Sequence, residues 1–439
     1  MQIKQISVTG LFGIFDHVIP LNMNDRITIV HGPNGFGKTA MLRLLNGFFN
    51  SDYSVFQTIP FINFNILFDN DTCIKISRSS TTVPSTKIEN ILFNFYDKNS
   101  DGKKYTITLQ RNIHGRNYRS TLSDNNVSKI RLGNRIMPQR NYQTSLFDKK
   151  TEEPEWLIEL KNSIRVRLIE SQRLLNDTSA YTYKRQSGVR FQSSSMLPTV
   201  STYSNEIAQS MRNKFSEYGV VSQSLDRTFP SRLVERQSSP NLTDEQLRSR
   251  LEQLEKIRAR LIEVGLLDKT ENAGFPVQPP EMDESTKNIL SVYVDDVEKK
   301  LSVFNEVANK IELLRNIINS KFAYSYKEMN FDKNKGFVFK TLYQSSISDS
   351  DTLLPTDLSS GEQHELVLLY ELLFKVEPKS LVLIDEPELS LHVGWQVQFL
   401  KDLQDIVKLT DLDILMATHS PDIIQDRWDL TVELKGMKK

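Results

Sequence analysis

A short glycine-bearing loop near the amino terminus has the residue types that bind phosphate. It follows Arg26 to His31, a run typical of a buried strand, and leads straight into a helical pattern. Glycines let backbone N–H groups turn inward around phosphate oxygens, and the start of the following helix adds partial positive charge. A glycine turn with a purely structural role is the alternative. The residues expected to bind nucleotide are Gly32, Pro33, Asn34, Gly35, Phe36, Gly37, Lys38, Thr39 and Ala40.

Two residues of this loop have distinct expected roles, and two acids complement them. Lys38 would bridge the β- and γ-phosphates of ATP, and the Thr39 hydroxyl would be a ligand of Mg²⁺. Far along the chain, Asp385 and Glu386 follow the apolar run Leu381 to Ile384. Successive strand residues point to opposite faces, so the two carboxylates have different roles. We expect Asp385 to hold Mg²⁺ and Glu386 to polarise the attacking water, with a solvated strand end as the alternative.

Two further stretches indicate which class of phosphate-loop protein this is. Leu358 to Gln363 (LSSGEQ) places serines and a glycine before a strongly helical segment. By itself it would be an ordinary helix cap. Thr418 and His419 follow a last apolar strand, Ile414 to Ala417. Taken in this order with the loop and the acids, these stretches resemble those of the ABC-type ATPase superfamily.

The resemblance implies sites that are shared between two copies of the chain. In that superfamily, the signature stretch of one subunit closes over the γ-phosphate held by the phosphate loop of another. His419 would sense this phosphate, and residues 390–392 would lie between the paired sites. The chain departs from the usual pattern at Ser360, where glycine is common. The signature residues that would contact nucleotide are Ser359, Gly361 and Glu362.

Spacing and further short phrases indicate a branch of the superfamily. About 320 residues separate Thr39 from Ser359, far more than in transporter subunits, so a large segment is inserted. The phrases DEPELSLHVGWQ and ATHSPDII resemble those of soluble ATPases related to RecF, the SMC proteins and OLD-type nucleases. The chain is most similar to stand-alone ATPases of bacterial anti-phage systems of the PARIS and Septu types. The resemblance implies that Gln172 links Mg²⁺ and nucleotide to the insertion; a surface glutamine after a strand is the alternative.

The composition restricts the partners and the compartment. The chain has 439 residues and zero formal net charge, yet residues 101–250 carry about +10. Aromatics and cations alternate from Tyr181 to Phe191, which suits DNA or RNA; a solvated loop, or contact with an acidic neighbouring subunit, is the alternative. The single cysteine, Cys73, indicates a reducing compartment. Without a charged leader or a long apolar run, we expect a cytoplasmic protein with no membrane segment.

The order of the patterns predicts an α/β fold, with an ABC-type ATPase head of two lobes interrupted by an insertion. We expect the first lobe at residues 1–175, the insertion at 176–320 and the second lobe at 321–439. The insertion would begin with a basic loop over 176–205. It would continue as a short antiparallel hairpin of two helices, one capped by Thr243 and the other running from Asp283 to Ile318. A β-hairpin between residues 323 and 343 would lead into the second lobe.

Together these patterns predict an ATPase whose ATP-bound heads pair, as at least a dimer, and control a separate effector protein in anti-phage defence. The effector, for example a nuclease, is expected to be another protein, because the sequence shows no nuclease domain and no hydrolytic triad. The runner-up is a DNA-repair or chromosome-maintenance ATPase that binds duplex DNA. A scaffold that binds ATP without turnover is disfavoured by the presence of Lys38, Asp385 and Glu386.

Overall fold

The computed structural model describes residues 1–83, 86–97, 100–112, 130–132, 135–137, 153–170, 175–176, 197–235, 243–268, 283–342 and 352–436. The chain forms two compact units, each assembled from segments that are distant in sequence. The first unit comprises Met1–Met23, Gly32–Val166 and Val432–Lys439, and the second comprises Asn24–His31 and Arg167–Thr431. This division separates the phosphate loop from the strand that precedes it in the chain.

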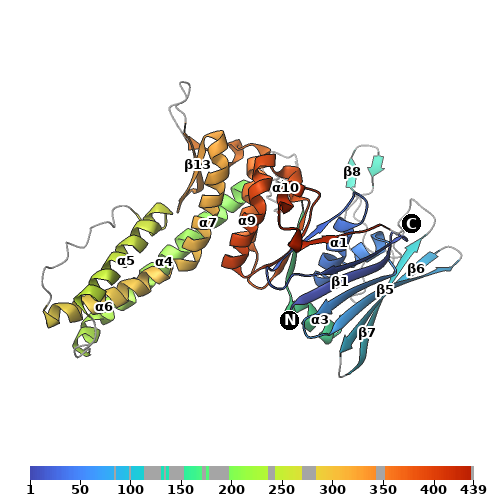
Figure 1. The fold of residues 1–439 in the computed structure, drawn as a ribbon, viewed down its shortest axis with the longest axis horizontal. Helices are drawn as coiled ribbons and strands as arrows, with labels where there is room; N and C mark the ends of the chain where they lie inside the picture. Colours follow the sequence, from blue (N-terminus) through green and yellow to red (C-terminus); the bar gives the residue numbers. More distant parts are fainter. Residues whose placement is uncertain are drawn as a thin grey trace. The chain divides into compact units, whose positions relative to one another are not determined.

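The first unit is built on an antiparallel sheet of six strands (Figure 1). Its strands are β1 (Ile3–Leu11), β2 (Phe15–Pro20), β4 (Asn63–Phe68), β5 (Cys73–Val83), β6 (Thr86–Asp97) and β7 (Ser100–Asn112). They lie in the order β2-β1-β4-β5-β6-β7. In β4 every second residue is buried, as expected for a sheet with one face against a core. Its helices are α1 (Lys38–Phe49), α2 (Ser54–Thr58) and α3 (Glu155–Ser163), and β8 (Ile130–Leu132) pairs with β9 (Arg135–Met137).

The second unit contains a parallel sheet of buried apolar strands. Its central strands are β16 (Leu381–Asp385), β17 (Asp413–Ala417) and β3 (Ile27–His31), which pair in that order and in parallel. The edge strands are β10 (Val166–Ile169), beside β16, and β18 (Thr431–Glu433), beside β3. In β16 and in β3 four consecutive residues are buried, which is typical of strands covered on both faces. The helices around this sheet include α8 (Ser360–Tyr370), α9 (Val393–Thr410) and α10 (Pro421–Ile424).

Four helices of the second unit form the helical arm: α4 (Thr199–Glu235), α5 (Asp244–Glu263), α6 (Glu284–Ser302) and α7 (Asn305–Phe322) (Figure 1). α6 packs against both α4 and α5. Thr243 caps α5 as predicted, with a reciprocal capping box to Gln246. Three leucines of α5, Leu247, Leu254 and Leu261, are buried in the core.

The arm departs from the prediction in two respects. First, the expected loop over 176–205 is wrong from Thr199 onward, where α4 begins. Val200, Tyr203 and Ile207 recur at helical spacing and are buried in the core, which stabilises the start of this helix. Second, the single helix predicted from Asp283 to Ile318 is two helices, because the chain breaks at Phe304. The Phe304 ring is fully buried and packs against Tyr218 of α4, with ring centroids 5.2 Å apart.

The β-hairpin lies between the arm and α8 in the sequence. It consists of β13 (Lys327–Asp332) and β14 (Gly336–Thr341), and β15 (Thr352–Leu353) pairs with β14. The first strand begins later than predicted, because residues 323–325 form a 3₁₀ turn. At Gly336 the hairpin touches α4: a Cβ there would lie 1.9 Å from the carbonyl oxygen of Ser204. The Ser204 hydroxyl accepts from the Phe337 N–H (2.9 Å), so hairpin and arm are joined at this point.

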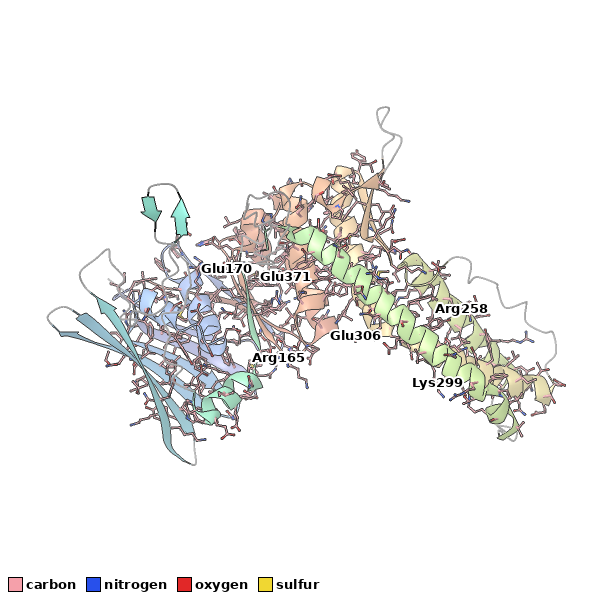
Figure 2. The ribbon with its side chains drawn as sticks, turned by 180° about the vertical axis from the view of Figure 1, so that it is seen from behind. Arg165, Glu170, Arg258, Lys299, Glu306 and Glu371 are labelled. Carbon is pink, nitrogen blue, oxygen red and sulfur yellow. The ribbon has the colours of Figure 1, made fainter. Side chains whose placement is uncertain are left out.

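The charges of the arm are arranged as ion pairs between neighbouring helices. Arg250 of α5 contacts Asp295 (2.8 Å) and Glu298 (2.7 Å) of α6. Arg232 of α4 forms an ion pair with the buried Asp296 of α6. Arg258 of α5 and Lys299 of α6 lie on two of these helices (Figure 2).

The aromatic and basic run Tyr181 to Phe191, expected to contact nucleic acid, lies outside the described residues. Another short pair, β11 (Leu175–Asn176) and β12 (Leu197–Pro198), precedes the arm. No described helix is both long and apolar enough to cross a membrane.

Candidate nucleotide site

The phosphate loop of the first unit has a backbone that only glycine adopts easily. Gly32, Gly35 and Gly37 have φ values of 153°, 84° and 89°, in the left-handed region. Space adds a second constraint at Gly37, where a Cβ would lie 2.3 Å from Cδ2 of Leu11. Gly37 is also the N-cap of α1 and provides no side chain to cap the helix. The N-cap residue itself therefore offers no side-chain acceptor to the first N–H groups of α1, which suits an anion site.

Lys38 turns back across this loop. Its Nζ donates to the carbonyl oxygens of Gly32 (2.9 Å) and Pro33 (3.2 Å), and the residue is only 5% exposed. The ammonium group is thereby held against the loop backbone, where we expect it to meet bound phosphate. Thr39 and Ala40 follow in the first turn of α1. These residue types and this backbone fit a nucleoside triphosphate with Mg²⁺.

A buried histidine supports the loop from β2. His17 is 3% exposed, and its Nε2 lies 2.8 Å from the carbonyl oxygen of Phe36. The Phe36 ring also packs against Phe15 of β2, with centroids 5.0 Å apart. Asn34 and Pro33 are exposed. His17 therefore has a structural role, because it holds the backbone of the phosphate loop.

In the second unit, Asp385, Glu386 and His419 lie at one edge of the parallel sheet. Asp385 pairs with Ala417, and Ala417 pairs with Val30, so β16, β17 and β3 end at the same edge. The phosphate loop starts in the chain directly after β3. Asp385, the last residue of β16, is half-buried. Carboxyl ends of parallel strands are where α/β proteins generally bind ligands.

Glu386 has a strained backbone and faces His419. Its φ of 45° places it in the left-handed region, and its backbone N–H donates to the Ala417 carbonyl (2.9 Å). Strain of this kind is costly and persists mainly at functional sites. The Oε1 of Glu386 lies 3.7 Å from Nε2 of His419, and each side chain is 30% exposed. Both groups are thus accessible to a ligand and close to each other.

The signature stretch is placed at the start of α8. Ser359 is the N-cap of this helix: its hydroxyl accepts from the Glu362 N–H, while its own N–H donates to the Glu362 carboxylate (2.8 Å). Glu362 also accepts from Lys327 (2.8 Å) and Ser325 (2.8 Å) and is 3% exposed. Its carboxylate is therefore engaged inside the protein. Ser359 and Ser360 are exposed, and Gly361 is half-buried.

These contacts affect the pKa of Glu362. Burial acts to raise the pKa, but the hydrogen bonds from Lys327, Ser325 and Ser359 outweigh burial and hold it below the usual value. The Ser-x-x-Glu spacing is that of a capping box, a sequence signal that indicates this structural role. The expectation that Glu362 contacts nucleotide is thus joined by a structural role in fixing the helix start.

A buried cluster of charges lies behind the signature helix. Lys321 of α7 contacts Glu365 of α8 and Asp402 of α9, the latter at 2.7 Å, and Lys321 and Glu365 are fully buried. Burial acts to lower the pKa of Lys321, but the two carboxylates outweigh burial and raise it. Burial raises the pKa of Asp402 more than Lys321 lowers it. One ammonium group thus joins an arm helix, the signature helix and the helix after the acids.

Replacing Lys321 with methionine is expected to lower the free energy of unfolding by about 3–5 kcal/mol near neutral pH, because two buried carboxylates lose their cation. Asp402 is an acid whose pKa is raised in the folded protein. Such a group contributes stability below its unfolded pKa, and this contribution is lost as the pH rises through the folded pKa. Removing the Lys321 cation raises the folded pKa of Asp402 further. The deficit should therefore grow between about pH 5 and about pH 8.

Urea denaturation of the two proteins at both pH values measures this difference. Lys408→Met, at an exposed position of α9, is the matched control and should change stability by less than about 0.5 kcal/mol. A deficit of the same size at both pH values would contradict the account of the buried cluster.

The remaining residues predicted for the site are Gln172 and residues 390–392. Gln172 lies outside the described residues. The side chain of Ser390 is likewise outside them, while His392 caps α9, with its Nδ1 accepting from the Gly394 N–H (3.2 Å). The sequence reasoning did not single out Glu388, whose carboxylate contacts both Thr418 and His419. No sequence signal distinguishes it from other loop acids.

Comparisons with known proteins bear on this arrangement. A family model described as an AAA ATPase domain matches residues 1–424, nearly the whole chain. The chain belongs to this AAA ATPase domain family. The phosphate loop and the two acids therefore lie within the part of the chain that matches an ATPase domain. The mixed α/β fold agrees with the fold class predicted from sequence.

Among solved structures, this AAA ATPase domain is similar to the SMC head domain from Thermotoga maritima, with a TM-score of 0.33 and 10% identity over 97% of this chain and 92% of that chain. It is also similar to the Smc head domain from Pyrococcus furiosus, solved with the C-terminal domain of ScpA bound, with a TM-score of 0.32 and 10% identity over 99% and 94% of the two chains.

A curated relative is protein ea59 of Escherichia phage lambda. It is 28% identical to this AAA ATPase domain over 133 residues, which are 30% of this chain and 25% of ea59. The matched stretch thus spans about a quarter of the length of that relative.

Proposed function

We propose that the protein binds ATP with Mg²⁺ and hydrolyses it in sites shared between two copies of the chain. The observation that carries this proposal is the pairing of Glu386 and His419, 3.7 Å apart and partly exposed, at the carboxyl edge of the sheet whose strand β3 leads into the phosphate loop. Membership of an ATPase family supports the choice of nucleotide.

Each residue has a defined role in this proposal. Lys38 and the loop N–H groups bind the β- and γ-phosphates. Thr39, Asp385 and Gln172 would hold Mg²⁺, which supplies charge neutralisation of the phosphates. Glu386 orients the attacking water and accepts its proton. His419 donates a hydrogen bond to the γ-phosphate and reports its presence.

The signature residues complete the site from a second copy. Ser359 and Ser360 are exposed at the positively polarised start of α8, and this helix end is rigid because Glu362 is fixed by Lys327 and Ser325. A rigid, exposed helix start suits the γ-phosphate of a neighbouring chain. Pairing is therefore proposed to depend on ATP.

The wider biological role follows from the motif resemblance. We propose that ATP-dependent pairing moves the helical arm and controls a separate effector protein, and that the residues 1–175, 176–320 and 321–439 are the corresponding lobes and insertion. The assignments to a cytoplasmic location and to anti-phage defence, and the alternative of DNA binding in repair or chromosome maintenance, are supported by sequence alone.

Mixing two inactive variants tests the shared site. Lys38→Ala removes the phosphate ligand but keeps the signature, while Ser359→Arg blocks the signature but keeps the phosphate loop. Random pairing of equal amounts gives about half mixed dimers with one intact site in two, so about one quarter of wild-type ATP hydrolysis should return. Ser216→Arg, at an exposed position on α4, is the control and should be active alone. Full activity of Ser359→Arg by itself, or no recovery on mixing, would refute the shared site.

A further inference from the structure

The loops that follow β16 and β17 are tied together by a carboxylate to which the proposed mechanism gives no role. Glu388 accepts a hydrogen bond from the Thr418 hydroxyl (2.8 Å) and another from the backbone N–H of His419 (2.6 Å). Thr418 is fully buried and Glu388 is half-buried. The Thr418 hydroxyl in turn accepts from the Ser420 N–H (3.0 Å). The carboxylate therefore holds the His419 N–H directly and the Ser420 N–H through the Thr418 hydroxyl.

A second tie connects the same two loops through Gln396 of α9. The Ser420 hydroxyl donates to Oε1 of Gln396 (2.6 Å), and Nε2 of Gln396 donates to the Leu391 carbonyl (3.2 Å). Ser420 and Gln396 are 8% and 9% exposed. Buried hydrogen bonds of this kind are expensive to break, because the freed groups find no water. The loop after β17 is thus fastened to the loop after β16 at two points.

We infer that Glu388 is a positioning residue that sets His419 at its distance from Glu386. Glu386 is two residues before Glu388 in the chain, and its N–H is already bonded to Ala417, two residues before His419. The bonds of Glu388 close this short ring on the other side. The 3.7 Å separation of the Glu386 and His419 side chains then follows from backbone geometry, while both side chains remain accessible. The catalytic part of this inference rests on the proposed ATP hydrolysis, whereas the geometric part does not.

The two available substitutions of Glu388 have different expected effects. Alanine removes both acceptors and leaves the His419 N–H and the Thr418 hydroxyl without their partner. Glutamine can keep both contacts, because its oxygen accepts from the His419 N–H and its NH₂ group donates to the Thr418 hydroxyl, which can also act as an acceptor. Glu388→Gln is therefore a conservative variant that should retain most of the function.

Kinetics of these variants separate positioning from a structural role. In Glu388→Ala, kcat for ATP should fall about 10- to 100-fold, the size of a lost charge-assisted hydrogen bond, while the Kd for ATP changes less than about twofold. Glu388→Gln should recover most of kcat. Glu255→Ala, at an exposed position on α5, is the matched control and should have no effect.

A double substitution tests whether Glu388 acts through His419. In a His419→Ala background the further change Glu388→Ala should cost little additional kcat, because the group that it positions is gone. Multiplicative losses in the double variant would overturn the inference, and so would an unchanged kcat in Glu388→Ala alone.

Hydrogen exchange gives a test that does not need turnover. In the wild-type protein the His419 N–H is bonded to Glu388, so in Glu388→Ala the amide exchange of a peptide covering residues 413–424 should become faster, with little change in Glu388→Gln. Unchanged exchange would overturn the inference even if the protein hydrolyses ATP. If the wild-type protein proves inactive, the proposed function fails while this measurement still decides the geometry. If Glu388→Ala fails to fold, Thr418→Val and Thr418→Ser provide a second pair of variants. Serine keeps the hydroxyl that bonds to Glu388 and valine does not, so slower turnover and faster exchange are expected only for Thr418→Val.

Discussion

A Lys38→Ala protein is expected to lose ATP binding and ATP hydrolysis by about 100-fold or more. The ammonium group is held by the carbonyl oxygens of Gly32 and Pro33, and Lys38 as a whole is 5% exposed. Alanine removes the one cation that the loop offers to phosphate, in a place where water replaces it poorly. Titration with a fluorescent ATP analogue and a phosphate-release assay measure the two losses.

The fold should survive this change, because the loop is also supported by His17 and by the packing of Phe36 on Phe15. Lys4→Ala, which removes an exposed lysine from β1 of the same unit, is the control and should bind ATP normally. Normal hydrolysis by Lys38→Ala would remove the phosphate-loop assignment altogether.

The second large effect is expected for Glu386→Gln, in which ATP binding persists and turnover falls by about 100- to 10,000-fold. The amide has the shape of the carboxylate but cannot accept the proton of the attacking water. Because Lys38 and Asp385 are unchanged, ATP should remain bound and hold the heads together. Light scattering should then show an ATP-dependent increase in mass that the wild-type protein shows only transiently.

Glu159→Gln, at an exposed position of α3, controls for the change in net charge. A Glu386→Gln protein that hydrolyses ATP at the wild-type rate would show that another group activates the water. One that binds ATP but never pairs would contradict the shared site and leave the role of Glu386 intact.

The parts of the structure that sequence predicted well are those where residue type and spacing carry the constraint. The phosphate loop requires three glycines in left-handed conformations before a helix, and the strands β16, β17 and β3 are continuous apolar runs. Thr243 predicted the start of α5 correctly, because a side-chain cap is a local interaction. In each case the physical cause lies within a few residues of its effect.

The parts that were missed depend on contacts between distant segments. The polar start of α4 is helical because Tyr203 and its neighbours pack against residues far along the chain, including a stacking contact with Tyr370 at 4.6 Å. The break at Phe304 leaves the apolar period almost unchanged, so the sequence does not reveal it. The bond from Glu388 to His419 spans 31 residues, and nothing near Glu388 indicates its partner.

The contact of Gly336 with Ser204 has a mechanical consequence. Because β14 and α4 approach closely at Gly336 and the Ser204 hydroxyl accepts from the Phe337 N–H, we expect a rotation of the hairpin to turn α4 with it. α4 has 37 residues and at about 1.5 Å per residue is about 55 Å long. Because the contact is at Ser204, about 46 Å of this helix lies beyond the joint, and a rotation of the hairpin by about 5° would displace the far end of α4 by about 4 Å. Because the hairpin also carries Lys327, which fixes Glu362, a small rotation at the signature is expected to become a larger displacement at the far end of α4.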